Sequence, residues 1–403
     1  MLSESLEFHP ERDAGLFAAV PAAPAVFLLR GEDPQSEPYV SKTTNLKRRL
    51  ERLLAPPEER SRRLNLRDRV RHIEYTLTGS DFESGLRLYR ALRTLFPKTY
   101  RDKLRLRLAP LVKFNLDNPY PRAYVTQRIS SLRGKSVYYG PFPTRVAAEK
   151  FLNDALDLFK MRRCDFDLHP DPAFPGCIYS EMKMCLAPCF KGCSDEEYRV
   201  EVGRVRAFLD TGGQSLVREL AEQREQASAS LEFEQAAGLH ARLEKISAAA
   251  RLPEVVRRLD VLAGVVVQPS AEKDSVALFR FQSGLLAAPL NFPVPPAEGK
   301  PQSMESRLQE ALEPRGAAAP ALRASAAELM EHLAILKRWY YRSAKLGEIF
   351  FADERGELPL RRLVRGVSRV FRGEKAEVDS TSSAAREYWL ARTREPETAP
   401  PEE

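Results

Sequence analysis

The sequence predicts an α+β protein built from more than one domain. Its 403 residues are too many for one compact core, and 43% hydrophobic with 30% charged residues is an ordinary globular composition. Short apolar runs bounded by turn residues and longer stretches with helical periodicity occur in separate groups along the chain. Such grouping is typical of several small domains that combine sheets with helices.

The first third is expected to form a small α/β domain over residues 20–110. Apolar runs at 25–29 and 38–41 flank a turn-rich segment and predict a β-hairpin. A basic helix is expected at about 45–54, a strand at 72–78, and a helix from about Asp81 to Phe96 that Pro97 ends. Residues 39–113 contain 20 basic and 8 acidic residues, although the whole chain carries only +7. This basic domain therefore predicts a polyanionic partner.

The second region, residues 111–195, combines expected strands at 110–116, 122–129 and 136–142 with a cysteine-rich segment. All five cysteines lie between Cys164 and Cys193, which is too clustered for a secreted disulfide framework. Four thiolates close in sequence can hold either zinc or an iron–sulfur cluster, and the absence of paired CxxC knuckles favours the cluster. Buried thiols without a ligand are the structural alternative.

The remaining chain divides into three parts. Residues 196–252 are expected to be helical, with a helical hairpin at 215–229 and 232–250; residues 253–372 form a mixed α/β region; and residues 373–403 form a polar, flexible tail. The hairpin seam is expected to contain Leu216, Leu220, Phe233, Ala236, Leu239 and Leu243.

The early apolar stretch from Leu16 to Leu29 does not predict a membrane anchor. Pro21 and Pro24 interrupt it, and it is too short to cross a bilayer. We therefore expect a cytoplasmic protein without a membrane partner. The sequence does not indicate an oligomeric state.

Several motifs resemble one known family. The segments Met161–Cys164, Cys177–Cys189 and Glu196–Tyr198 closely resemble the cysteine region of the UvrC excinuclease family. Leu231–Ala237 resembles the core of the UVR motif, and Tyr39–Leu46 resembles the second half of a GIY-YIG nuclease signature. The resemblance runs in order from about Ala25 to Leu252.

This resemblance implies a cofactor and a partner. It assigns a 4Fe–4S cluster, with zinc as the alternative, to Cys164, Cys177, Cys185 and Cys189, and leaves Cys193 as an extra thiol. The UVR motif implies that a UvrB-like helical hairpin docks on Phe233, Ala236 and Leu239. A self-contained helical hairpin is equally compatible with the periodicity, and His240-Ala241 departs from the family's Arg-Asp, which leaves partner specificity open.

The resemblance also implies a nuclease site, which this sequence does not complete. GIY-YIG enzymes use two tyrosines, an arginine and a metal-binding glutamate. Tyr39 and Arg49 match the second tyrosine and the arginine, whereas Phe27 replaces the first tyrosine and Leu88 occupies the glutamate position. Glu83 is five residues from Leu88 and lies off that helical face. An apolar side chain cannot hold a divalent ion, so a Mg or Mn site is not expected there.

Two interpretations of function follow. One is a UvrC-like DNA-binding protein of nucleotide excision repair whose nuclease activity is impaired or absent; the alternative is an active, structure-selective DNA endonuclease. In both, Lys42, Lys47, Arg48, Arg49 and Arg52 are expected to sit together and contact DNA phosphates. The family's second, RNase H-like nuclease is matched only in its leading strands, at 259–294, and the lone His332 is expected to be structural.

Overall fold

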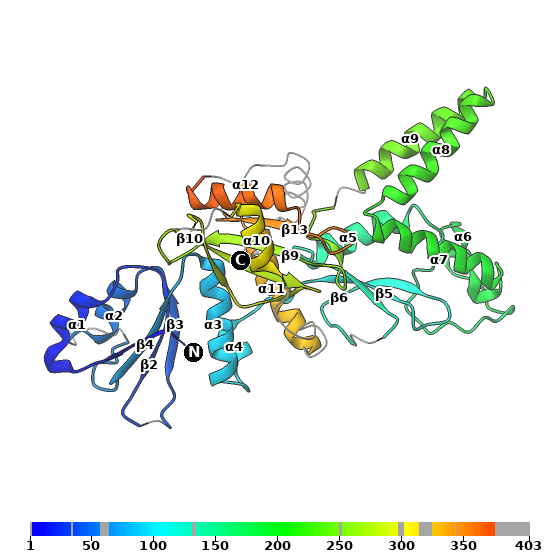
Figure 1. The fold of residues 1–403 in the computed structure, drawn as a ribbon. Helices are drawn as coiled ribbons and strands as arrows, with labels where there is room; N and C mark the ends of the chain where they lie inside the picture. The colour runs from blue at the N-terminus through cyan, green and yellow to red at the C-terminus, as the bar shows by residue number, and fades with distance from the viewer. Residues whose placement is uncertain are drawn as a thin grey trace, which may run out of the picture.

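The computed structural model describes residues 2–33, 35–56, 64–130, 134–249, 252–296, 302–313, 325–343 and 345–374. Three antiparallel sheets, each with its own helices, lie one after another along an elongated molecule (Figure 1). This arrangement confirms the predicted α+β, multidomain fold. Most of the expected tail, residues 375–403, lies outside the described residues.

The N-terminal unit is a four-stranded sheet in the order β1-β4-β2-β3. Its strands are β1 (Glu4–Glu7), β2 (Ala25–Arg30), β3 (Tyr39–Thr43) and β4 (His72–Leu77), with helices α1 (Asp13–Ala19) and α2 (Leu46–Leu54). The predicted hairpin is confirmed, because Ala25 pairs with Thr43 and Leu29 with Tyr39. Helix α2 begins where Asn45 accepts a hydrogen bond from Arg48 N, and its four leucines pack on one face of the sheet. The 3₁₀ turn at Pro10–Arg12, β1 and α1 were not predicted.

The C-terminal unit is a sheet in the order β11-β10-β9-β13, with β12 also paired to β10. Its strands are β9 (Gly264–Pro269), β10 (Ser275–Gln282), β11 (Leu285–Leu286), β12 (Leu290–Pro293) and β13 (Glu348–Phe351). Helices α10 (Met304–Leu312) and α12 (Leu360–Phe371) pack together with β9 and β10 in one core, and α11 (Ala326–Tyr340) belongs to a second. This region therefore combines strands with helices, as the predicted mixed α/β character requires.

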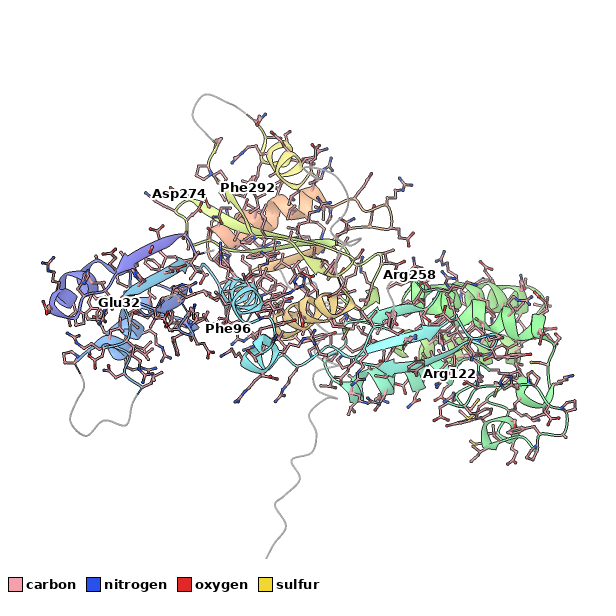
Figure 2. All side chains as sticks on the ribbon, turned by 90° about the horizontal axis from the view of Figure 1, so that it is seen from below. Glu32, Phe96, Arg122, Arg258, Asp274 and Phe292 are labelled. Atoms are coloured by element: carbon pink, nitrogen blue, oxygen red, sulfur yellow. The ribbon has the colours of Figure 1, made fainter. Side chains whose placement is uncertain are left out.

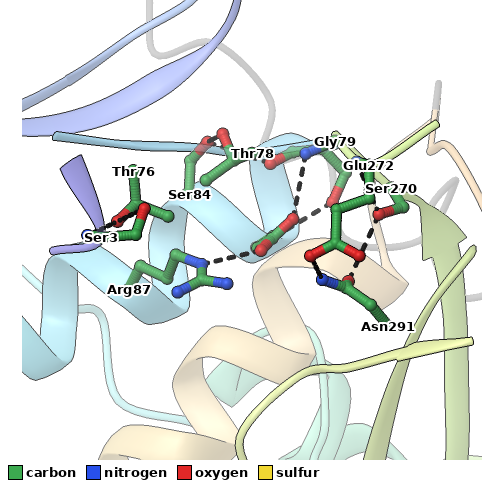
Figure 3. A network of polar contacts seen from close by, with 11 residues as sticks. Ser3, Thr76, Thr78, Gly79, Ser84, Arg87, Ser270, Glu272 and Asn291 are labelled. Atoms are coloured by element: carbon green, nitrogen blue, oxygen red, sulfur yellow. Dashed lines mark hydrogen bonds and ion pairs between the residues drawn. The ribbon is translucent and has the colours of Figure 1, made fainter. Parts of the chain in front are cut away.

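Helix α3 (Asp81–Leu95) lies between these two units and is followed by the short α4 (Tyr100–Leu104). On the C-terminal side, Phe82 packs edge-on against Phe279 and Tyr89 packs against His332, with ring centroids 5.0 and 5.3 Å apart. The preceding loop also touches this unit, because a Cβ on Gly79 would lie 2.1 Å from Pro269 O. Figure 3 shows Gly79 close to Ser270, whereas Ser84 and Arg87 lie farther from Ser270 and Asn291.

A buried carboxylate joins α3 and α4 to α11. Glu331 accepts hydrogen bonds from Tyr89 Oη and Tyr100 Oη, both at 2.8 Å, and from Arg101 Nε at 2.7 Å. Burial and the Glu331 carboxylate together raise the pKa of Tyr89. Beside this group, buried His332 accepts a hydrogen bond from Leu286 N at 3.0 Å, and burial lowers its pKa to about 4. His332 is structural, as expected.

The middle unit contains a third sheet, in the order β6-β5-β7-β8. Its strands are β5 (Leu111–Asn115), β6 (Arg122–Thr126), β7 (Val137–Gly140) and β8 (Arg257–Arg258), with α5 (Arg145–Leu156), α6 (Ile178–Glu181) and α7 (Asp195–Asp210). Helix α7 starts with a capping box, since Ser194 Oγ accepts from Glu197 N and Glu197 accepts from Ser194 N. Its buried face contains Tyr198, Val202, Val205 and Phe208.

Helices α8 (Gln214–Ala229) and α9 (Phe233–Ala249) form the predicted hairpin, which projects from the middle unit (Figure 1). Leu216, Leu220 and Leu243 are buried, as the predicted seam requires. Phe233 is 66% exposed, so its assignment to the seam is wrong: it lies at the tip, beyond the point where α8 can cover it. Among the described residues, no helix has the length and apolarity needed to cross a membrane.

Candidate metal centre and nucleic-acid interface

Four cysteines of the middle unit line one pocket, hereafter the thiol pocket. They are Cys164, Cys177, Cys185 and Cys189, the four positions that the family resemblance implied, and Cys193 is not among the lining residues. The chain makes tight turns between them, with left-handed backbone at Lys183 (φ 58°) and Ala187 (φ 56°) and a 3₁₀ turn at Pro188–Phe190. The pocket lies at the end of the molecule beyond Arg122 (Figure 2).

Two donors already point at sulfur atoms of the thiol pocket. Ala187 N donates to Cys185 Sγ at 3.3 Å, and Arg162 Nη1 donates to Cys164 Sγ at 3.5 Å. Such donors stabilise thiolates, which are the form of cysteine that binds metal. Arg162 is 1% exposed, so its charge acts in a poorly solvated environment.

The thiols themselves resist ionisation without a bound cation. Burial, together with the charges of the other cysteines, raises the pKa of Cys185 to about 11, and burial also raises the pKa of Cys189. Several thiolates therefore coexist in this pocket when a positively charged group displaces their protons.

The lining residues fit an anionic, sulfur-bound group. Arg163 Nε is buried and has no hydrogen-bond partner, although Arg163 Nη2 binds Asp157 Oδ1 at 2.7 Å. A buried donor without an acceptor, on a side chain that lines the pocket, is suited to a sulfur or sulfide acceptor. Within the described ranges, no set of three or more His, Cys, Asp or Glu side chains is close enough to hold a single metal ion.

A second constellation lies on the α2 side of the N-terminal sheet. Arg49 Nη2 donates to Tyr39 Oη at 2.7 Å, which brings together the two residues predicted as remnants of a catalytic site. Phe27 is fully buried beside Tyr39, with ring centroids 6.1 Å apart, and offers no hydroxyl. The Tyr39–Arg49 site therefore consists of one phenol and one guanidinium.

The predicted cluster of DNA-binding cations is divided by the pleat of β3. Successive side chains of a strand point to opposite faces, and Tyr39 packs in the α2 core whereas Val40 packs in the α3 core. Lys42 shares the face of Val40 and forms an ion pair with Asp81, which also binds Arg342 Nη1 at 2.7 Å. Burial raises the pKa of Asp81, but hydrogen bonds and charges from Lys42 and Arg342 outweigh it, and the net pKa is lowered.

The other predicted cations remain together on α2. Arg48 and Arg52 are exposed on the side of the helix away from its buried leucines, and Lys47 is half-buried on the flank of the helix. The Arg49 guanidinium contacts Tyr39. In the described part of the chain, no hydrogen bond or ion pair occupies the side chains of Lys47, Arg48 and Arg52. We call Lys47, Arg48 and Arg52 the α2 basic face.

The two α3 residues weighed as metal ligands have structural roles. Leu88 is partly buried against the same core as Val40. Glu83 is 3% exposed; it accepts from Gly79 N at 3.0 Å and from Arg87 Nε at 2.7 Å. Its carboxylate thus holds the first turn of α3, and neither residue presents an oxygen to the Tyr39–Arg49 site.

The hairpin tip carries exposed apolar side chains. Leu231, with left-handed backbone (φ 62°), is 71% exposed, and Phe233 begins α9 beside it. The other two predicted partner residues, Ala236 and Leu239, are partly buried along α9. Large apolar groups exposed on a projecting element are typical of a docking surface.

Sequence reasoning missed how the units are joined. The bridge from Lys42 through Asp81 to Arg342 and the Glu331 group connect residues more than 200 positions apart, and no local pattern marks them. The burial of Arg162 beside the cysteines likewise has no signal in the local sequence.

Comparisons with known proteins match the middle of the chain. Residues 110–208 match a family model described as "UvrC/Cho excinuclease, middle domain", and residues 214–249 match "UvrB/uvrC motif". The chain is 30% identical over 252 residues to UvrABC system protein C of Carboxydothermus hydrogenoformans, covering 60% of this chain and 40% of that protein. It is also 30% identical over 287 residues to UvrABC system protein C of Stenotrophomonas maltophilia (strain K279a), covering 68% and 44%.

A third relative, UvrABC system protein C of Haemophilus influenzae, is 33% identical over 215 residues, covering 51% of this chain and 33% of that protein. This chain thus spans less than half the length of these curated relatives. No solved structure matches it. The two model matches, together with the similarity to these proteins, show that residues 110–249 of this chain are of the UvrC type.

Proposed function

We propose that this protein binds DNA in nucleotide excision repair, as a cytoplasmic protein, and that the α2 basic face contacts the phosphate backbone. The single observation that carries this proposal is a helix with four leucines in the core and three unpaired cations outside. Cations of this kind release counterions from DNA and bind it with little sequence preference.

The salt dependence of binding tests this proposal. Replacing Lys47, Arg48 and Arg52 together by Gln should reduce the slope of log Kd against log salt by about 3, because each lost phosphate contact removes about 0.9. The matched control replaces Arg361, Arg362 and Arg365 of α12, three exposed arginines, by Gln. Equal losses in both triple variants would show that general charge, and not this face, binds DNA.

We infer further that cleavage at the Tyr39–Arg49 site is impaired or absent. Phosphodiester hydrolysis needs an oriented water and a cation that stabilises the charge developing on phosphate. Arg49 can supply one cation and Tyr39 one hydroxyl, but Phe27 and Leu88 provide neither a second hydroxyl nor a metal ligand. The alternative, an active structure-selective endonuclease, has the retained Tyr39–Arg49 contact in its favour.

A nicking assay with Mg²⁺ or Mn²⁺ on damaged and branched duplexes separates these two functions. For an impaired nuclease, we expect no nicking by the natural protein and none by the Glu83→Ala variant. Leu88→Glu, which restores a carboxylate at the metal-ligand position, should produce detectable nicking. Nicking by the natural protein that the Tyr39→Phe variant loses would establish the endonuclease instead.

We also propose that the hairpin tip docks on a UvrB-like helical hairpin. Leu231 and Phe233 provide the apolar contact, and the projection of the hairpin leaves them accessible. Phe233→Ala should weaken binding to the UvrB protein of the same organism by tenfold or more, a size of effect typical of a central aromatic anchor, or about 1.4 kcal/mol. Val200→Ala, at an exposed valine of α7, is the control. Unchanged affinity of the Phe233 variant would refute this docking mode.

Finally, we propose that the thiol pocket holds a 4Fe–4S cluster, with zinc as the alternative. Four thiols line the pocket, Arg162 Nη1 donates to Cys164 Sγ, and Arg163 Nε is a buried donor without an acceptor. When bound, a 4Fe–4S cluster supplies a one-electron redox couple and cross-links the four cysteine positions. Anaerobic purification followed by iron, acid-labile sulfide and zinc determinations tests this assignment; zinc without sulfide would replace it.

A further inference from the structure

Arg162 is a buried cation without a carboxylate partner. Its Nε donates to Tyr120 O and its Nη1 to Phe166 O, both at 3.0 Å, so these two acceptors are neutral carbonyls. Across the described residues, no Asp or Glu forms an ion pair with it, and it is 1% exposed. Burying an unpaired charge is strongly unfavourable, and such a charge is retained in proteins where another group balances it.

The balancing group lies in the thiol pocket. Of the atoms that accept from the Arg162 side chain, Cys164 Sγ is the one that can carry negative charge, at 3.5 Å from Nη1. The adjacent Arg163 differs, because Asp157 already pairs with its guanidinium at 2.7 Å. Lys160 differs too: its backbone carbonyl accepts from Leu186 N beside Cys185, but its side chain is exposed to water.

The surroundings hold Arg162 in place before any ligand binds. Its backbone N donates to Tyr198 Oη at 3.2 Å, and Tyr198 Oη donates to Pro121 O at 2.8 Å. The guanidinium is therefore fixed between the start of β6, helix α7 and the cysteine segment. A fixed charge needs little reorganisation to act on a bound group.

We propose that Arg162 is a positioning residue that supplies the counter-charge for the metal group held by the thiol pocket. This inference rests on the proposed cofactor, and it assigns Arg162 two measurable effects. Its charge favours the more negative, reduced state of a bound cluster and so raises the reduction potential. The charge of Arg162 also slows loss of the metal, because a nearby cation stabilises the thiolates that bind the metal.

The test uses the full chain, purified anaerobically, with Arg162→Met, Arg162→Lys and the control Lys160→Met. We expect Arg162→Met to release metal to a chelator roughly tenfold faster than the natural protein, as losses of outer-shell partners commonly do. Its reduction potential, followed by the cluster absorbance, should shift to more negative values. Arg162→Lys, which keeps the charge, should lie close to the natural protein, and Lys160→Met should match it because water screens that charge.

Two comparisons keep the outcomes distinct. The iron and sulfide content of the natural protein decides the proposed cofactor; if zinc is retained instead, the chelator rates still decide the role of Arg162. Equal release rates and equal potentials in the natural protein and Arg162→Met would overturn the inference. So would Arg162→Lys behaving like Arg162→Met, since packing and hydrogen bonding, and not charge, would then explain the loss.

Discussion

The α3–α11 contact and the thiol pocket each surround one buried charged residue, and the two charges are satisfied differently. Glu331 is surrounded by protein donors: two tyrosine hydroxyls and the Arg101 guanidinium. The Arg162 side chain donates hydrogen bonds to two backbone carbonyls and one thiol, and among the described residues no carboxylate pairs with it. The difference separates a charge that holds the architecture together from a charge that we propose balances a bound group.

The largest effect is expected from substitutions in the thiol pocket. Cys185→Ser should remove essentially all bound metal, because it takes away one of four thiols of the pocket. Cys193→Ser is the matched control, since Cys193 does not line the pocket and metal content should stay at the natural level. Metal content per chain, measured after anaerobic purification, checks both variants. Equal loss in both would mean that the ligand set is wrongly assigned.

The architectural side is tested by Glu331→Ala. This variant leaves the buried hydroxyls of Tyr89 and Tyr100 without their acceptor and should lower the free energy of unfolding by about 3 kcal/mol. Glu328→Ala, which removes a more exposed partner of Arg93, should cost about 1 kcal/mol or less. Urea denaturation measures both values. Similar costs for the two variants would contradict the distinction between a buried and a surface carboxylate.

The pH dependence of stability gives a second test of the α3–α11 contact, because His332 of α11 packs against Tyr89 of α3. Because burial lowers the pKa of His332 to about 4, the unfolded chain binds more protons than the folded protein between about pH 6.5 and 4. The nearby charges are Glu328, Glu331, Arg90 and Arg93. Stability should therefore fall as pH falls through this window, by about 2 kcal/mol between pH 7 and pH 5 from this group.

Substituting the histidine isolates its contribution. His332→Asn keeps a hydrogen-bond acceptor for Leu286 N but cannot titrate, so its stability should depend less on pH over the same range. Urea denaturation at pH 7 and pH 5 measures the difference. A pH dependence as steep as that of the natural protein would exclude His332 as its source.

The smallest effect is expected at the Tyr39–Arg49 site, which is only partly buried, unlike Glu331 and Arg162. Tyr39→Phe removes one partly exposed hydrogen bond and should change the free energy of unfolding by about 1 kcal/mol or less. Thermal or urea denaturation checks this value. A loss of several kcal/mol would show that the pair is part of the architecture and not an accessible site.

The predictable parts of the fold follow from local patterns. The hairpin at 25–43, the Ser194 cap of α7 and the helical hairpin all follow from periodicity, caps and turn residues that lie close together in the sequence. The clustering of all five cysteines between Cys164 and Cys193 predicted a thiol site, and the family resemblance implied which four of them form it. Short β1 and β13 were not, because their strand partners, β4 and β9, are distant in sequence.

The sequence also could not show which cations share a surface. Lys42 and Arg49 are only seven positions apart, yet they lie on opposite sides of the N-terminal sheet. Successive residues of β3 point to opposite faces, so Tyr39 contacts Arg49 on the α2 side, whereas Lys42 lies on the other side and pairs with Asp81. Burial of Arg162 depends on Tyr120, Phe166 and Tyr198, which come from three separate segments. Both features arise from tertiary contacts alone.

The projection of the α8–α9 hairpin separates the two surfaces that we propose as contacts. At 17 residues, α9 spans about 25 Å, and the N-terminal unit with α2 lies at the opposite end of the molecule (Figure 1). The hairpin tip at Phe233 and the α2 basic face therefore share no residue and no supporting helix. A substitution at one of these surfaces leaves the other unaltered, so the two proposed contacts can be tested one at a time.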